Sequence, residues 1–301
     1  MSGFPTQDFL LALPLTALAV AVVLGITLFV ALRVGKHAVV DVAWGLGFVV
    51  IAVVSYGVSA AFDEGDAGRR LLVTALTAIW GLRLATHIGL RSRGHGEDPR
   101  YEALLDKATG NRTAYAIRKI YLTQGAVMWF VSLPVQVAAF QPDGLGFEGF
   151  GFLVWIGVFV WAVGMFFETV GDLQLTRFRN DADSKGKVLD TGLWRYTRHP
   201  NYFGDACVWW GLSLIAFSAW PGILTVLSPV FMTFLLAKGT GKPTLEKDMD
   251  KRRPGYTDYI RRTSGFVPLP PRTLADSDGS PQPRAFRAPP GRSTSPDRKQ
   301  P

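Results

Sequence analysis

The chain has few of the residues that build metal sites, redox sites and nucleotide-binding loops. Cys207 is the only cysteine, which excludes a disulfide within the chain and a thiolate metal site. The four histidines are scattered without the spacing of metal ligands, so we expect no metal site. No Rossmann or Walker glycine fingerprint occurs, so a nucleotide would have to bind between helices.

Long apolar runs fill most of the remaining sequence. Of the 301 residues, 48% are hydrophobic, and a helix needs about 20 apolar residues to cross a bilayer. We therefore expect an all-α fold, a multi-pass membrane helical bundle of about seven spans. The expected spans lie at residues 9–32, 39–62, 71–90, 120–140, 150–170, 201–217 and 220–237.

The composition changes near the C-terminus. We expect an integral membrane helical domain over residues 1–271. Residues 272–301 are rich in Pro, Ser, Asp and Arg and poor in apolar side chains. That composition is typical of a disordered tail, because it offers too little apolar surface to bury.

The positive charges gather in alternate loops. Residues 91–119 carry seven Lys and Arg and residues 177–198 carry six, whereas the loops at 63–66 and 142–149 are acidic or neutral. Because cytoplasmic loops are enriched in Lys and Arg, we expect the N-terminus outside and the C-terminal tail in the cytoplasm. The net charge of +8 then reflects topology and contact with anionic lipid, and we expect no nucleic-acid partner.

One segment differs from the helical pattern around it. Residues 192–205 (GLWRYTRHPNYFGD) place charged and aromatic side chains at the start of an apolar helix. Trp, Tyr and Arg also anchor helices at lipid headgroups, which explains the first residues of the segment. Anchoring does not explain His199, Asn201 and Asp205, and polar groups at a membrane helix end usually mark a site. We therefore interpret the segment as functional.

The ionisable groups of the predicted spans lie near the cytoplasmic ends, at one membrane level. This level holds Asp41, Arg83, His87, Glu168, Asp172, His199, Asp205, Lys238, Lys242 and Glu246. Their convergence predicts a polar cavity that opens to the cytosol. Glu168 and Asp172 are four residues apart and share one helix face, so they need a cation between them. A packing salt bridge with Arg83 and a cofactor contact would each meet that need.

Several motifs together resemble a known superfamily. They are residues 41–45 (DVAWG), the 93–101 loop, and residues 124–136, 167–179, 192–205 and 253–268. On these motifs, from Asp41 to Pro271, the chain resembles the membrane-embedded steroid 5-alpha-reductase superfamily. The likeness is strongest to its bacterial group, which is catalogued as domain of unknown function 1295. The resemblance implies an integral protein of the bacterial inner (plasma) membrane.

That resemblance also implies an activity and a cofactor. The reductases take NADPH from the cytosol and add hydride to an activated carbon–carbon double bond of a lipid. Matched by position in the motifs, the residues expected to bind the cofactor are Arg93, Asp172, Arg179, Lys187, Arg198, His199, Asn201, Asp205, Lys238, Lys242 and Glu246. Glu168 stands where the steroid enzymes have an amide. Their substrate-side pair of Glu and Tyr has no match in this chain, and the residue near that position is Leu90. The expected substrate is therefore a lipid of steroid, isoprenoid or acyl type.

Reduction of a double bond also needs a proton donor. A tyrosine, or a carboxylic acid that apolar surroundings keep protonated, can donate to the acceptor oxygen. The catalytic candidates are Tyr202, Glu168 and Asp41, in that order.

Two other interpretations come from different functional classes. The chain is also similar to isoprenylcysteine carboxyl methyltransferases, at Arg198-His199-Pro200, Tyr202, Gly204, Glu246 and residues 255–259. That resemblance implies S-adenosylmethionine as the cofactor and methyl transfer to a lipid carboxylate or thiol. Such chemistry needs few phosphate-binding arginines, so the many arginines favour NADPH. The third interpretation is a non-catalytic, lipid-binding membrane protein.

Overall fold

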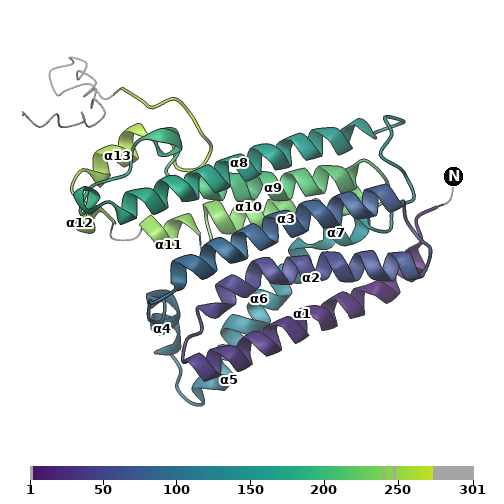
Figure 1. The fold of residues 1–301 in the computed structure, drawn as a ribbon, viewed down its shortest axis with the longest axis horizontal. Helices are drawn as coiled ribbons and strands as arrows, with labels where there is room; N and C mark the ends of the chain where they lie inside the picture. The colour runs from purple at the N-terminus through teal and green to yellow at the C-terminus, as the bar shows by residue number, and fades with distance from the viewer. Residues whose placement is uncertain (1–2, 240, 247–248, 274–301) are drawn as a thin grey trace, which may run out of the picture.

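The protein is a bundle of helices (Figure 1). The computed structural model describes residues 3–239, 241–246 and 249–273, and these contain helices and turns without a β-strand. The all-α prediction is confirmed for them. Five stretches are long and apolar enough to cross a membrane, which fits an integral membrane protein: Thr6–Val34, Val39–Ala61, Ala67–Ser92, Phe152–Asn180 and Gly222–Arg252.

The helices follow one another with short connections. The long ones are α1 (Thr6–Val34), α2 (Val39–Ala61), α3 (Ala67–Ser92), α8 (Phe152–Asn180), α9 (Pro200–Phe217) and α10 (Leu227–Ala237). Shorter pieces before α8 are α4 (Pro99–Leu105), α5 (Arg112–Ala116), η1 (Ile117–Tyr121), α6 (Leu122–Val131) and α7 (Leu133–Ala138). Those after α8 are η2 (Ala182–Ser184), η3 (Gly192–Arg195), η4 (Gly222–Thr225), α11 (Lys242–Glu246), α12 (Met249–Arg252) and α13 (Tyr256–Arg262).

Two of the seven predicted spans differ from the other five. The span predicted at 120–140 falls on an interrupted helix, in which α6 ends at Val131 and α7 restarts with Pro134 in its first turn. Proline is tolerated there because an N–H at that position has no intrahelical partner. The span predicted at 201–217 is α9, whose 18 residues extend for about 27 Å. The count of seven stays a prediction.

Helix α9 lies in the middle of the bundle, where it packs against α3, α7, α8 and α10. Its Trp209 contacts Phe48 of α2 and Trp80 of α3, with ring centroids 4.5 and 5.3 Å away. All three rings are fully buried. Tilted and edge-to-face contacts between large rings are favourable and directional. This aromatic core therefore fixes α2, α3 and α9 against one another.

Helices α8 and α9 approach each other through glycine. Along α8 the glycines recur every seven residues, and the facing side of α9 has the same spacing: Gly157, Gly164 and Gly171 in α8, and Gly204 and Gly211 in α9. A Cβ on Gly157 would come within 2.6 Å of the carbonyl oxygen of Gly211. Small residues let helix backbones come this close in membranes. The repeat therefore sets both the spacing and the register of the pair.

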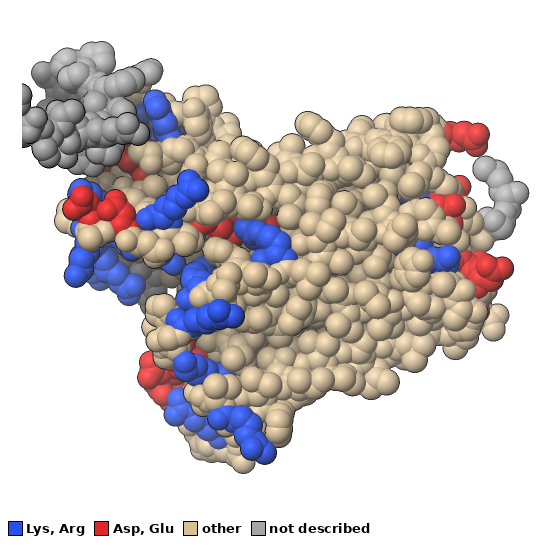
Figure 2. Space-filling model, in the orientation of Figure 1, with Lys and Arg blue, Asp and Glu red and all other residues tan. Residues whose placement is uncertain are grey.

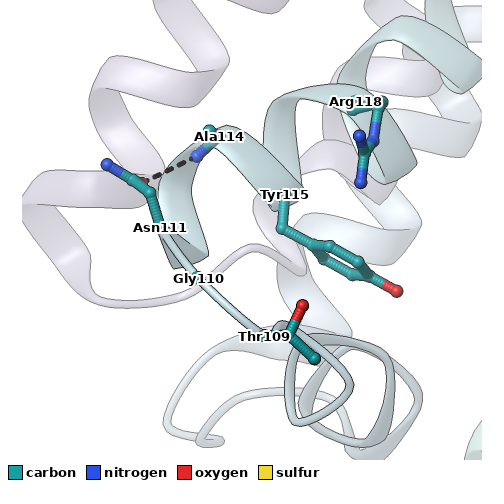
Figure 3. Close-up of a pocket in the computed structure, with 6 residues that line it drawn as sticks. All are labelled: Thr109, Gly110, Asn111, Ala114, Tyr115 and Arg118. Carbon is teal, nitrogen blue, oxygen red and sulfur yellow. Dashed lines mark hydrogen bonds between the residues drawn. The ribbon is translucent and has the colours of Figure 1, made fainter.

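The two ends of the bundle differ in charge. Most Lys and Arg of the face shown, with some Asp and Glu among them, lie at the end with α4, α11, α12 and α13, which we call the basic end; the charged groups at the other end, the acidic end, are mainly Asp and Glu (Figures 1 and 2). This separation agrees with the predicted alternation of basic and acidic loops. Close to α5, six residues line a recess of about 230 Å³ (Figure 3): Thr109, Gly110, Asn111, Ala114, Tyr115 and Arg118. Of the predicted tail, residues 274–301 lie outside the described residues.

One arginine at the acidic end is buried. Arg69, in the first turn of α3, is only 1% exposed. It donates hydrogen bonds to neutral acceptors, among them Gln141 Oε1 (3.0 Å), Ser218 Oγ (2.7 Å) and the carbonyl of Ile215 (2.9 Å). Arg69 lies just before the span predicted at 71–90, so the expectation about ionisable groups of the spans does not cover it. A guanidinium can be buried at this end because its fork of donors is satisfied by carbonyl and hydroxyl oxygens.

Candidate functional site

A group of carboxylates is buried where α3, α8 and α9 meet, toward the basic end. Glu168 and Asp172 of α8 are 3% and 5% exposed. The guanidinium of Arg83 lies between them, with nitrogens 2.5 Å from Glu168 Oε1 and 2.6 Å from Asp172 Oδ2. The predicted common face is confirmed, and the cation that this face needs is Arg83. The pair is therefore held by a fork of charge-assisted hydrogen bonds, which are the strong kind.

Other side chains complete this cluster. Trp80 Nε1 donates to Glu168 Oε2 over 3.0 Å, and Asn201 Nδ2 donates to Asp172 Oδ1 over 3.1 Å. Asp205 of α9 is buried beside them, and its Oδ1 makes no hydrogen bond with a described residue. We call Arg83, Glu168, Asp172, Asn201 and Asp205 the acidic cluster. Two of the three carboxyl groups contact the Arg83 guanidinium, and His87 Nε2 lies 3.5 Å from Asp172 Oδ2, so the cluster can hold a proton or a cationic group.

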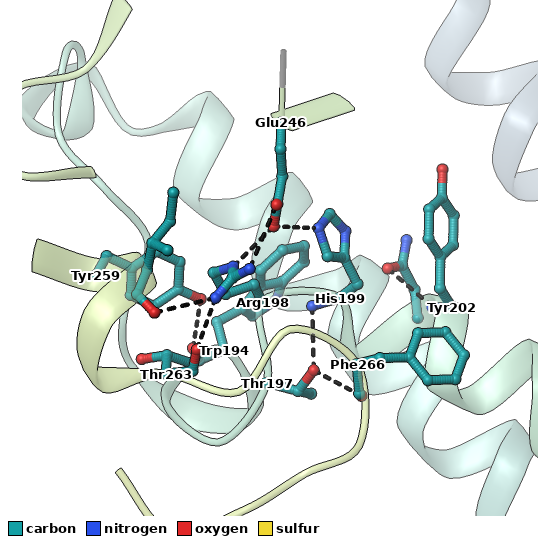
Figure 4. A network of polar contacts seen from close by, with 11 residues as sticks. Trp194, Thr197, Arg198, His199, Tyr202, Glu246, Tyr259, Thr263 and Phe266 are labelled. Atoms are coloured by element: carbon teal, nitrogen blue, oxygen red, sulfur yellow. Dashed lines mark hydrogen bonds and ion pairs between the residues drawn. The ribbon is translucent and has the colours of Figure 1, made fainter. Parts of the chain in front are cut away.

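A second network fastens the C-terminal segment to the start of α9 (Figure 4). Glu246 of α11 accepts from Arg198 Nε over 2.7 Å, and its Oε1 lies 2.9 Å from His199 Nε2. The other side of the Arg198 guanidinium donates to the carbonyl of Thr263 over 2.7 Å. One arginine therefore joins three separate parts of the chain. We call Arg198, His199, Glu246 and Thr263 the clamp.

Hydrogen bonds to the backbone extend the clamp. Thr197 Oγ1 donates to the carbonyl of Phe266 over 2.8 Å, and the buried Tyr259 hydroxyl donates to the carbonyl of Trp194 over 2.5 Å (Figure 4). Burial lowers the pKa of His199, which precedes α9, below the ordinary value of 6.5. The ring is therefore neutral at pH 7 and donates one N–H to Glu246. Burial also raises the pKa of Tyr256 to about 12.

A third network ties the 93–101 loop to the start of α2. Asp41 accepts from the Tyr101 hydroxyl over 2.5 Å and from an Arg100 guanidinium nitrogen over 2.9 Å. Glu97 accepts from the backbone N–H groups of His37 and Ala38, over 2.5 and 2.9 Å. Burial, together with the charge of Asp41, raises the pKa of Tyr101, so its phenol keeps the proton that it donates. The loop is thus fixed in place.

Tyr202 lies between these networks. Its ring stacks on His199, with centroids 5.5 Å apart and planes 12° apart (Figure 4). The charges of Arg91, Arg100 and Asp205 act on its phenol. No hydrogen bond among the described residues involves the Tyr202 hydroxyl. By contrast, the carboxylates of Glu168 and Asp172 both accept hydrogen bonds from neighbouring side chains. The Tyr202 hydroxyl is therefore available to a ligand.

Several arginines beyond the acidic cluster have no carboxylate partner in the part of the chain that the structure describes. Arg179, in the last turn of α8, lies within electrostatic range of Arg91, Arg253 and Asp172. Arg253 donates to the carbonyl of Lys187, and its guanidinium lies over the Phe178 ring, 6.0 Å from the centroid. The ion pairs of the described residues use other cations. Arg91, Arg179 and Arg253 therefore form a positive group, the arginine group, that can attract an anion.

A comparison with protein families identifies the group to which the chain is related. Residues 27–263 match the family described as Protein of unknown function (DUF1295). The chain belongs to this family. No curated protein and no solved structure matches the chain. This match confirms the DUF1295 group that the motifs indicated, while the wider likeness to steroid 5-alpha-reductases stays a prediction.

The structure brings many of the predicted site residues of this DUF1295 protein together. Glu168, Asp172, Asn201 and Asp205 share the acidic cluster, and Arg198, His199 and Glu246 share the clamp. The others are more dispersed at the basic end. Asp41 faces the 93–101 loop, Arg93 follows α3, Lys187 lies in the loop after η2, Lys238 ends α10, and the Lys242 ammonium lies against Gly265.

Two residues of the arginine group, Arg91 and Arg253, were not among the predicted cofactor contacts. A signal for Arg91 exists in the sequence. Arg83, His87 and Arg91 are each four residues apart, so one face of α3 carries all three. No comparable spacing points to Arg253, because it reaches Lys187 from a distant part of the chain. Among the described residues no group of three or more His, Cys, Asp or Glu is arranged to hold a metal ion.

Proposed function

We propose that the protein is a membrane oxidoreductase that reduces an activated carbon–carbon double bond of a lipid with NADPH. The observation that carries this proposal is the arginine group of Arg91, Arg179 and Arg253, which has no carboxylate partner among the described residues and whose Arg179 lies within electrostatic range of Asp172. Arginine binds phosphate with two parallel hydrogen bonds. A dinucleotide phosphate fits such a group better than a ligand of low charge does.

The donors available at the basic end suit the cofactor. Arg93, Arg179 and Lys187 would hold the phosphates, together with Arg91 and Arg253. Asn201 and Asp205 would lie along the less charged part of the cofactor, at the edge of the acidic cluster. Bound NADPH supplies the hydride, and the protein positions and polarises the acceptor. We place this end in the cytoplasm, where NADPH is found, because Lys and Arg gather there.

Tyr202 is the first candidate for the proton donor. Glu168 is held by Arg83 and Trp80, and Asp41 is held by Arg100 and Tyr101, so neither carboxylate has a proton ready to give. The Tyr202 hydroxyl has no such partner among the described residues and lies within electrostatic range of Arg91 and Arg100. In this proposal Tyr202 gives its proton to the acceptor, and solvent replaces it.

Cofactor binding by the detergent-purified, full-length protein tests the proposal. NADPH quenches tryptophan fluorescence, and the nine tryptophans make the signal convenient. We expect saturable binding of NADPH that Arg179→Ala weakens about tenfold or more, since one charged hydrogen bond contributes about 1.5–3 kcal/mol. Arg177→Ala is the matched control, because Arg177 is exposed on the same last turn of α8. Equal binding by both variants would remove Arg179 from the site.

A methyltransferase is the second candidate, favoured by one observation. Arg198, His199 and Glu246, which carry the likeness to isoprenylcysteine carboxyl methyltransferases, are in direct contact. Against it, the Glu246 carboxylate is already bonded to both partners and has little left for the sulfonium of S-adenosylmethionine. A thermal shift with S-adenosylmethionine, and none with NADPH, would favour the methyltransferase. A shift with neither would favour the non-catalytic lipid-binding protein.

A further inference from the structure

The recess beside α5 lies apart from the three networks and has features of a binding site. We propose that it binds the phosphate of an anionic phospholipid headgroup through Arg118. Its volume of about 230 Å³ equals that of roughly eight water molecules at about 30 Å³ each, enough for a phosphodiester and part of its glycerol. The residues around it do not belong to the proposed NADPH site, so the two proposals stand independently.

The lining offers donors and no carboxylate (Figure 3). Arg118, the Tyr115 hydroxyl and the Thr109 hydroxyl can each donate a hydrogen bond. Asn111 Oδ1 already accepts from the backbone N–H of Ala114 over 3.0 Å, which leaves the amide NH₂ of Asn111 as a further donor. A pocket made of donors selects an anion that presents several acceptor oxygens, as a phosphate does.

The charge of Arg118 is not neutralised by the protein. Its guanidinium lies over the Tyr115 ring, 5.8 Å from the centroid, and the described residues give it no ion pair. Nearby, Arg112 differs because Asp106 lies 3.5 Å from its guanidinium. Arg118 is therefore held by an aromatic face, with its charge left for a ligand.

The backbone behind Arg118 is unusual. Residues Ile117–Tyr121 form one π-helical turn inside the otherwise α-helical run from α5 to α6. Such turns are rare, and they occur frequently at functional sites. The turn inserts an extra residue and so rotates Arg118 relative to the apolar face of α6. This is a second observation, independent of charge, that singles out the same residue.

The recess also lies at the right depth for a headgroup. One turn after Arg118, Leu122 is 63% exposed, and the apolar surface of α6 begins there. On α1, which packs beside η1, Arg33 lies over the exposed Phe29 ring, 4.9 Å from the centroid. Both arginines mark the level at which exposed apolar side chains give way to charge. Basic pockets at that level are a known mode of binding anionic lipid headgroups.

Thermal unfolding of the delipidated full-length protein tests the proposal. The probes are short-chain phosphatidylglycerol, phosphatidylcholine of the same chain length, and inorganic phosphate. We expect phosphatidylglycerol to raise the unfolding midpoint in a saturable way. Arg118→Gln should weaken its apparent affinity about tenfold or more, and Arg118→Lys less, because lysine keeps the charge but lacks the planar fork.

Lys119→Gln is the matched control. Lys119 is the exposed neighbour of Arg118 and does not line the recess, so its variant should bind phosphatidylglycerol within about twofold of the wild type. Equal weakening by Arg118→Gln and Lys119→Gln would overturn the proposal in favour of general attraction to a basic surface. The proposal would also be overturned if phosphatidylcholine, or inorganic phosphate at the same concentration as the anionic lipid, raised the unfolding midpoint as much as phosphatidylglycerol does. Since Arg118 is exposed, its variants should unfold like the wild type without lipid.

Discussion

Gly204 of α9 lies so close to α8 that a Cβ on it would be 2.5 Å from the carbonyl oxygen of Gly164. The same Cβ would be 2.5 Å from the backbone nitrogen of Glu168. Asp205, the next residue of α9, is thereby brought within electrostatic range of Glu168. The glycine repeat therefore has a functional consequence: it forces two carboxyl groups together in the acidic cluster.

Gly204→Ala should destabilise the protein by about 1–3 kcal/mol, because the added methyl group overpacks a backbone contact. Thermal unfolding in detergent measures the effect. Gly57→Ala in α2 is the control, since a Cβ there meets nothing within 4 Å. That variant should be neutral or more stable by up to about 1 kcal/mol, as alanine is the better helix former. Equal stability of the two variants would show that α8 and α9 are not in backbone contact.

Arg83→Ala should destabilise the protein more, by about 3–5 kcal/mol, because it leaves Glu168 and Asp172 buried without their shared cation. The measurement is again the unfolding midpoint. Arg91→Ala on the same face of α3 removes an exposed arginine that has no carboxylate partner among the described residues, and it should change stability by less than about 0.5 kcal/mol. A small loss for Arg83→Ala would mean that the carboxyl groups of the cluster are neutral.

The clamp should weaken in mild acid. The pKa of His199 is lowered by burial from the ordinary 6.5, so below about pH 6.5 an unfolded chain takes up a proton that the folded chain does not. The contribution of His199 to the free energy of unfolding is therefore fully present above that pH, and it falls as the pH drops toward the lowered pKa. Below the lowered pKa it is constant.

Unfolding midpoints between about pH 7.5 and pH 5 measure this dependence. Burial also lowers the pKa of His37, so the relevant quantity is the difference in slope between wild type and variant. His199→Gln should have the shallower slope, while His95→Gln, at an exposed position, should keep the wild-type slope. If His199→Gln kept the wild-type slope, the His199 imidazole would have the same pKa in the folded and the unfolded protein.

Tyr202→Phe should separate chemistry from binding. If Tyr202 gives the proton, the variant should lose about 10²–10⁴-fold in NADPH oxidation driven by a bacterial membrane-lipid extract, with its NADPH affinity nearly unchanged. Tyr196→Phe is the control, because Tyr196 is 43% exposed and precedes the helix. If Tyr202→Phe turned over at the wild-type rate, the proton donor would be a group other than Tyr202.

Local periodicity in the sequence was enough to predict the long helices and the common face of Glu168 and Asp172. These features depend on residues a few positions apart. The break between α6 and α7 was not predicted, because Pro134 lies inside an apolar run long enough for an unbroken span. The burial of Arg69 was missed for a related reason, since its partners Gln141 and Ser218 are far along the chain.

The acidic cluster was more predictable than the clamp. Its members lie on regular helices, where spacing determines which side chains meet, and Arg83 was foreseen as one possible partner. In the clamp, Glu246 contacts Arg198 from a short helix after a turn, and turns do not transmit a regular spacing. The resemblance to known families placed both residues in one site, but their direct ion pair required the structure.

The clamp has a consequence for how the protein matures. The 192–199 segment is completed by the carbonyls of Thr263 and Phe266, which are synthesised 65 and 69 residues after their partners Arg198 and Thr197. Most of the bundle can insert and pack before that point, so a nascent chain passes through a stage with a membrane domain and an unfinished site. A topology reporter fused near residue 250 would therefore register correct insertion in a protein that has never assembled its basic end.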